Sequence, residues 1–270
     1  MWVYGMWRGV NCEGSQVVDL ITLDFETFYD QEFSLRKMTT EAYVRDPRFE
    51  VIGVGIKLNN EDTEWASGTH KQIKRYLSQN FAWQEASLLC HNTMFDGAIL
   101  NWCFGIRPRM YTDTLCIARA LHGTEASASL AMLSQRYNIG VKGTEVLDAK
   151  GKRRADFSEE ELSAYGDYCI NDVELTHQLF NIMASGVTTG CRFPPEELKL
   201  IDLTLRMYTE PTLGLDVKLL RSHLEDVKAR KVALLREANI DKKELMSNPK
   251  FAEVLKGLGV VPPMKISPTT

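Results

Sequence analysis

The chain has 270 residues, of which 44% are hydrophobic and 25% charged, and this composition is typical of one large or two modest globular domains. Its formal net charge of −4 excludes a basic scaffold that holds nucleic acid by bulk charge alone. No apolar run approaches the roughly 18 residues that a membrane helix requires. Six scattered cysteines form no CxxC pair, so neither a zinc site nor a disulfide framework is indicated. We therefore expect a cytoplasmic protein without a membrane partner, whose cysteines are reduced core thiols.

The first half of the chain predicts strands, followed by strands that alternate with helices. Residues 17–25 form a short, β-branched, apolar run between polar residues, which is typical of a buried strand, and residues 50–58 repeat this character. We also expect strands at 62–65, 87–90 and 109–112, and helices at 71–78, 96–103, 114–121 and 130–137. This order predicts an α/β domain built around a mixed sheet.

The second half of the chain is predicted to be helical. A long helix is expected to begin at Ser158, because Ser158 and Glu161 have the spacing of a capping box. Amphipathic helices follow at 196–208 and 217–238, and Asp216 is the expected N-cap of the second. We accordingly divide the chain into an N-terminal extension (1–16), an α/β domain (17–190) and a smaller all-helical region (191–270).

Two acids lie close together in the first predicted strand. Asp24 and Glu26 are two residues apart, so both side chains point to the same face of the strand. Two neighbouring carboxylates favour a bound cation, although a D-x-E pair alone is also common at solvated strand ends. A third acid, Asp96, follows the strand predicted at 87–90 and opens an apolar helix, where an N-cap role is the alternative. Each of these features is weak without the others.

The long predicted helix carries a fourth acid. Tyr168 and Asp172 are four residues apart and therefore share one helix face. The alternative is a solvated acid beside a core tyrosine, since polar faces are available on this helix. Tyr165 is a competing tyrosine, but its seven-residue spacing from Asp172 places it two turns away. An aspartate buried in the middle of this helix would need a partner.

Together, the segments LDFET, NTMFD and YCIND resemble, in this order, the three exonuclease motifs of the DEDD superfamily of 3′-5′ exonucleases. The third segment resembles the subfamily that has a tyrosine four residues before the last aspartate. The resemblance implies a ribonuclease H-like fold, in which a mixed sheet is flanked by helices. It also implies two divalent metal ions, Mg²⁺ or Mn²⁺, bound by the four acids, with Tyr168 orienting the attacking water. The implied catalytic residues are Asp24, Glu26, Asp96, Tyr168 and Asp172.

The C-terminal region extends the resemblance. The phrases TEPTLGLDVKLL and SNPKFAEVLKGLGV resemble the connection and the first part of the thumb in family A (Pol I-like) DNA polymerases, particularly those of phages. No palm or fingers sequence follows, so we expect no polymerase active site in this chain. A palm and fingers module encoded elsewhere is a candidate partner, in the cytoplasm of a bacterial or phage-infected cell.

The expected activity is removal of nucleotides from single-stranded or frayed DNA 3′ ends, as in proofreading. Alternatives are a ribonuclease D-like 3′-5′ exoribonuclease and a catalytically silent nucleic-acid-binding fragment. Aromatic residues near the acids could stack on terminal bases, and a basic run could guide phosphates, although core packing and a solvated loop are the alternatives. The candidate substrate contacts are Phe28, Asn92, Phe95, Lys152, Arg153 and Arg154.

Overall fold

The computed structural model of the protein describes residues 9–10, 17–143, 149–186 and 192–263. They belong to two compact units, Met1–Thr212 and Leu213–Thr270. Cys90, Cys103, Cys116 and Cys169 are free thiols, whereas Cys12 and Cys191 lie outside the described residues, as does most of the predicted N-terminal extension. In the described parts of the chain, no helix combines the length and the hydropathy needed to cross a bilayer.

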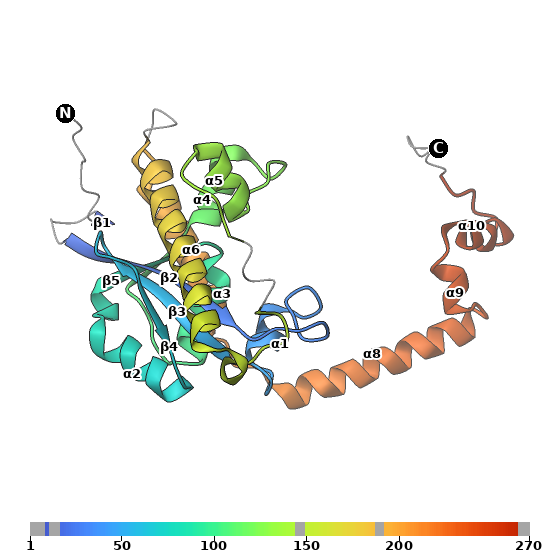
Figure 1. Ribbon diagram of the computed structural model, residues 1–270. Coiled ribbons are helices and arrows are strands. Elements are labelled where there is room, and N and C mark those ends of the chain that lie inside the picture. Colours follow the sequence, from blue (N-terminus) through green and yellow to red (C-terminus); the bar gives the residue numbers. More distant parts are fainter. Residues whose placement is uncertain (1–8, 11–16, 144–148, 187–191, 264–270) are drawn as a thin grey trace. The chain divides into compact units, whose positions relative to one another are not determined.

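A mixed sheet forms the centre of the first unit (Figure 1), as the sequence predicts. Its strands follow the order β4-β3-β2-β5-β6, and the short β1 pairs with the start of β2. The β2–β5 and β5–β6 pairs are parallel, whereas β2–β3 and β3–β4 are antiparallel. The strands are β1 (Gly9–Val10), β2 (Val17–Thr27), β3 (Val51–Leu58), β4 (Glu64–Ser67), β5 (Ala86–Cys90) and β6 (Met110–Asp113).

Helices cover both faces of this sheet. One core packs α1 (Thr40–Val44), α2 (His70–Asn80) and α3 (Thr93–Trp102) against it. A second core joins the opposite face to α4 (Thr114–His122), α5 (Leu130–Tyr137) and α6 (Glu159–Ser185). Figure 1 shows α6 crossing the sheet, and Ser158 and Glu161 form the predicted capping box at its start. The short α1 is an element that the sequence pattern did not reveal.

The central strand β2 divides its side chains between the two cores. Leu23 and Phe25 belong to the core with α2 and α3. Thr22 points the other way, and its Oγ1 lies 3.1 Å from Nδ1 of His177 on α6. Because side chains alternate along a strand, the acids at positions 24 and 26 lie on the α6 face. Both carboxylates of β2 therefore face helix α6.

Gly55 in β3 allows α6 to lie close to the sheet. Gly55 pairs with Asp24. A Cβ atom at Gly55 would lie 2.9 Å from Sγ of Cys169 and 3.1 Å from Cγ2 of Val173, both on α6. Any larger residue at position 55 would push the helix away from the acid-bearing part of β2.

Helix α7 (Pro195–Thr209) belongs to the first unit, although the sequence suggested that a helical region begins at residue 191. Its Leu205 is buried, and Nε1 of Trp102 donates a 2.8 Å hydrogen bond to the carbonyl oxygen of Thr209. The backbone N–H of Tyr111 donates to Oδ1 of Asp202 at 2.7 Å. The boundary therefore follows Thr212, because α7 packs on α3 and β6.

The second unit is helical. It contains α8 (Val217–Glu237), α9 (Lys242–Leu245) and α10 (Asn248–Gly257), and no residue of these helices is buried. Asp216 caps α8 as predicted, since its side chain accepts a hydrogen bond from the backbone N–H of Leu219 at 2.9 Å.

Candidate active site

The acid-bearing end of β2 has a strand neighbour on one side only. The parallel pairing with β5 runs from Asp19 to Thr22, whereas the pairing with β3 continues to Thr27. The backbone N–H of Phe25 is therefore available, and it donates to Oδ1 of Asp96 at 3.0 Å. This bond brings a carboxylate from α3 beside those of β2.

The start of α3 places Asp96 inside the helix. The helix begins at Thr93, and its N-cap Asn92 has a left-handed backbone with φ of 74°. Asp96 thus lies in the first turn and is only 2% exposed, so the N-cap alternative is wrong. The backbone N–H of Asn92 donates to Oδ1 of Asp113 at 3.0 Å, and Asp113 also caps α4. The positive end of the α3 dipole favours a carboxylate at this position.

Helix α6 contributes the remaining acid and two tyrosines. Tyr168 and Asp172 are both buried on one face of the helix, and the Tyr168 hydroxyl hydrogen-bonds with the Asp172 carboxylate. Tyr165 has a different partner, because its hydroxyl donates a 2.5 Å hydrogen bond to Oε2 of Glu26. Its ring lies between Phe157, with ring centroids 5.5 Å apart, and Tyr168, at 6.2 Å. Both tyrosines therefore face the acids.

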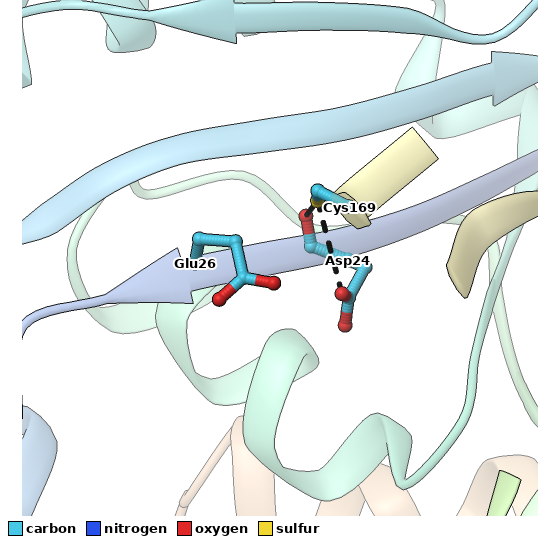
Figure 2. Close-up of side chains that lie close together, drawn as sticks. All are labelled: Asp24, Glu26 and Cys169. Atoms are coloured by element: carbon cyan, nitrogen blue, oxygen red, sulfur yellow. Dashed lines mark hydrogen bonds between the residues drawn. The ribbon is translucent and has the colours of Figure 1, made fainter. Parts of the chain in front are cut away.

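Figure 2 shows Asp24 and Glu26 on β2 beside Cys169 of α6. Potential ligand atoms of these three side chains all lie within 4.8 Å of one another. Sγ of Cys169 lies 3.4 Å from the carbonyl oxygen of Asp24 and 3.8 Å from its Oδ2. Burial and the charge of Asp24 raise the pKa of this thiol, so Cys169 is a neutral donor to Asp24. Cys169 is not among the residues predicted from the sequence, although it follows Tyr168 directly.

The carboxylates repel one another in a largely dry setting. Burial and the charge of Asp172 raise the pKa of Asp24 to about 7. Burial, followed by the charge of Asp24, also raises the pKa values of Glu26 and Asp96. Removing ionised carboxylates from water is costly unless a cation compensates them. This oxygen-rich cluster with excess negative charge fits a hard divalent metal ion.

One basic side chain reaches the cluster. Lys142 forms an ion pair with Asp172, and its Nζ lies 4.8 Å from the centre of the Tyr168 ring. Lys142 is not among the predicted site residues, because it lies outside the three motifs. The structure thus brings together the five predicted catalytic residues and adds three neighbours, Tyr165, Cys169 and Lys142.

The predicted stacking residues near the acids differ in exposure. Phe28 is a core residue rather than a stacking surface, since it is 6% exposed and packs on Phe33 at 6.0 Å. Phe95 is half-buried, with its ring 6.1 Å from that of Tyr43. Asn92 is exposed at the start of α3. Asn92 and Phe95 therefore remain candidates for contact with a substrate beside the acid cluster, whereas Phe28 packs in the core.

The predicted basic run has partners within the protein. Arg153 donates to Oε2 of Glu50 at 2.7 Å, and its guanidinium lies 4.1 Å from the centre of the Phe28 ring. Nε of Arg154 donates to Oγ of Ser67 at 3.0 Å. Lys152 pairs with Glu161 on α6 at 2.6 Å. These side chains hold the segment before α6 against the rest of the unit.

The mixed sheet flanked by helices is the ribonuclease H-like fold of 3′-5′ exonucleases. Its central strand carries two acids, and the facing helix carries a tyrosine and an aspartate four residues apart. Residues 22–188 match the 3′-5′ exonuclease family. The chain belongs to this family. No curated protein matches the sequence.

Solved structures with the same fold include RNase D of Trypanosoma brucei in complex with RNA U12, at 12% identity and a TM-score of 0.56, covering 73% of this chain and 66% of that one. NrnC of Brucella melitensis bound to pGG is similar at 17% identity and a TM-score of 0.52, covering 72% of this chain and 84% of that one. Neither is a phage polymerase, so the resemblance of the C-terminal region to a polymerase thumb stays a prediction.

Proposed function

We propose that this 3′-5′ exonuclease removes nucleotides from single-stranded or frayed DNA 3′ ends in a reaction that depends on two divalent metal ions, Mg²⁺ or Mn²⁺. The observation that carries this proposal is the convergence of carboxylates from β2, α3 and α6 in one buried cluster beside Tyr168. Such a cluster serves metal-assisted phosphodiester hydrolysis, whereas Lys142 alone offsets only part of its negative charge.

The metal-binding groups in this proposal are Asp24, Glu26, Asp96 and Asp172. Bound divalent ions would activate water and neutralise the charge of the phosphoryl transition state. Asp24 and Glu26 each interact electrostatically with the other three acids, so the four carboxylates form one set. The Phe25 N–H holds Asp96 in position and the Tyr165 hydroxyl holds Glu26, so neither carboxylate has to reorient freely when ions bind.

Tyr168 is proposed to position the attacking water. Burial, followed by the charge of Asp172, raises its pKa, so the hydroxyl remains protonated at neutral pH. It therefore acts by hydrogen bonding and does not take a proton from water. Its present hydrogen bond with Asp172 places the hydroxyl beside a proposed metal ligand.

The preference for DNA rests on the C-terminal region. Its polymerase-like phrases are joined by basic side chains on α8, all exposed and suited to phosphate contact: Lys218, Arg221, Lys228, Arg230, Lys231 and Arg236. A second candidate is RNA trimming, which is favoured by the fold shared with an RNase D that was solved with RNA U12. A partner polymerase module remains part of the first proposal only.

The site assignment is tested with 3′-labelled single-stranded DNA in Mg²⁺, Mn²⁺ or EDTA. We expect mononucleotide release in either metal and none in EDTA. Asp172→Asn should reduce the rate by at least about 100-fold, because it removes a metal ligand. Asp167→Asn is the matched control, since Asp167 is an exposed acid on the same helix. Equal rates for the two variants would overturn the site assignment.

The substrate assignment is tested separately by offering DNA and RNA of the same sequence, both single-stranded and as duplexes with one mismatched 3′ end. The proposal expects a higher kcat/KM on DNA, and faster release from the mismatched end than from a paired end. A higher kcat/KM on RNA would favour the trimming candidate. Comparable turnover of paired and unpaired ends would contradict a requirement for a frayed end.

A further inference from the structure

Residues 140–142, which follow α5, lie along the surface of α6 next to the acid cluster. Gly140 has φ of 149°, and a Cβ atom there would lie 2.9 Å from Cδ2 of Leu175. The carbonyl oxygen of Val141 accepts a 3.1 Å hydrogen bond from Nδ2 of Asn171. The close approach and the hydrogen bond together fix the direction in which the next residue points.

The next residue is Lys142, whose ammonium enters the cluster. It pairs with Asp172, and the side chains are 28% and 5% exposed respectively. The same Nζ lies 4.8 Å from the centre of the Tyr168 ring, where the ring face favours a cation. The charge of Lys142 also lowers the pKa values of Asp24 and Glu26, against the larger effect of burial. One lysine therefore compensates several acids at once.

An ammonium and a metal ion compete for the same carboxylate. Lys142 contacts Asp172 through Oδ2, a hard oxygen ligand of the kind that a divalent ion needs. A metal ion bound at Asp172 would lie close to the ammonium, and like charges at such a distance repel strongly when water is partly excluded. A metal ion bound through Oδ2 of Asp172 would therefore displace the ammonium of Lys142.

We propose that Lys142 is a built-in counter-cation, which holds the cation position at Asp172 in the metal-free protein and is displaced when the metal binds. This inference rests on the proposed function, because it assumes that Asp172 is a metal ligand. The displacement weakens metal binding, since the ion that binds at Asp172 has to break an ion pair in a partly buried setting. Lys142 thus sets the metal concentration at which the site fills, and keeps the acids compensated below that concentration.

The test is isothermal titration of the full chain with Mn²⁺ and with Mg²⁺ in the absence of nucleic acid. Lys142→Met removes the charge but keeps the length of the side chain, and should lower the metal Kd at least tenfold. Lys142→Arg retains the charge and should leave the Kd within threefold of wild type. Lys57→Met is the matched control, because Lys57 pairs with Glu174 on the same helix at 2.8 Å, outside the cluster. Its Kd should be unchanged.

Melting temperatures provide a second readout. Lys142→Met should melt below wild type in EDTA and gain more from saturating Mg²⁺, because only the metal-free form uses the lysine. If Lys142→Met does not fold without metal, Lys142→Gln is titrated in its place. A Kd for the variant titrated, Lys142→Met or Lys142→Gln, that equals or exceeds that of wild type overturns the role of Lys142. Failure of the wild-type chain to bind either ion would instead overturn the proposed metal-dependent function.

Discussion

Replacing Asp24 with asparagine should make the metal-free protein more stable at neutral and alkaline pH. Burial and the charge of Asp172 raise the pKa of Asp24 to about 7 from an ordinary 3.8. Between these two values the folded protein binds more protons than the unfolded chain, so its stability falls as the pH rises through this window. Asparagine cannot ionise and removes this loss.

The size of the effect follows from the shift in pKa. A change from 3.8 to about 7 corresponds to about 4 kcal/mol, at ~1.4 kcal/mol for each unit. Asp24 is partly exposed, so solvent screening lowers the effect, and we expect about 2 kcal/mol. For a unit of this size, that free energy is equivalent to ~4–8 °C in melting temperature.

The assay is thermal unfolding of wild type and Asp24→Asn from pH 4 to pH 8 in EDTA. The curves should nearly coincide at pH 4 and separate progressively up to pH 7, with the variant more stable. Saturating Mg²⁺ should reverse the order, since only the wild type retains the carboxylate. Asp167→Asn, on an exposed acid, should show no such separation. A constant difference between wild type and Asp24→Asn at all pH values would refute the reasoning.

Three further predictions concern Tyr165, Gly55 and α7. Tyr165→Phe should lower kcat about tenfold, because Glu26 loses its buried hydrogen bond. Tyr76→Phe loses a hydrogen bond to the exposed Glu64 and should leave kcat unchanged. Gly55→Val should lower the free energy of unfolding in urea by about 2–3 kcal/mol and abolish most of the activity, because it displaces α6. Gly214→Ala should leave the free energy of unfolding unchanged, because a Cβ atom there meets no atoms within 4 Å. A chain cut after residue 212 should keep the melting temperature of the exonuclease unit, and one cut after residue 194 should lose ~5 °C or more in calorimetry. Unchanged kcat in Tyr165→Phe, unchanged unfolding in Gly55→Val, or an unchanged melting temperature in the chain cut after residue 194 would contradict the corresponding contact.

Local patterns were sufficient to predict most elements of the first unit. The β-branched run of β2 and the capping box of α6 are short-range signals, and both elements lie where the sequence places them. The same is true of the cap that Asp216 supplies to α8. These signals work because the hydrogen bonds involved connect residues that are close in the chain.

Contacts between distant segments could not be predicted in the same way. Tyr165 was set aside because its spacing from Asp172 is two turns, yet its partner is Glu26 on β2. Lys142 comes from a segment without a motif, and the close approach at Gly140 together with the Asn171–Val141 hydrogen bond directs it toward α6. Similarly, the amphipathic pattern of α7 shows that one face is covered but not which unit covers it. Each of these outcomes depends on packing that no single segment specifies.

The alternation of side chains along β2 restricts how the gene can change. An insertion or deletion of one residue between the start of the strand and Asp24 would turn both acids toward the core of α2 and α3, and would bring Leu23 and Phe25 to face α6. Point substitutions in this stretch alter one contact each, whereas a single-codon change in length would exchange the two faces. In related genes, we therefore expect length variation to be absent from this strand and to collect in the loops around it.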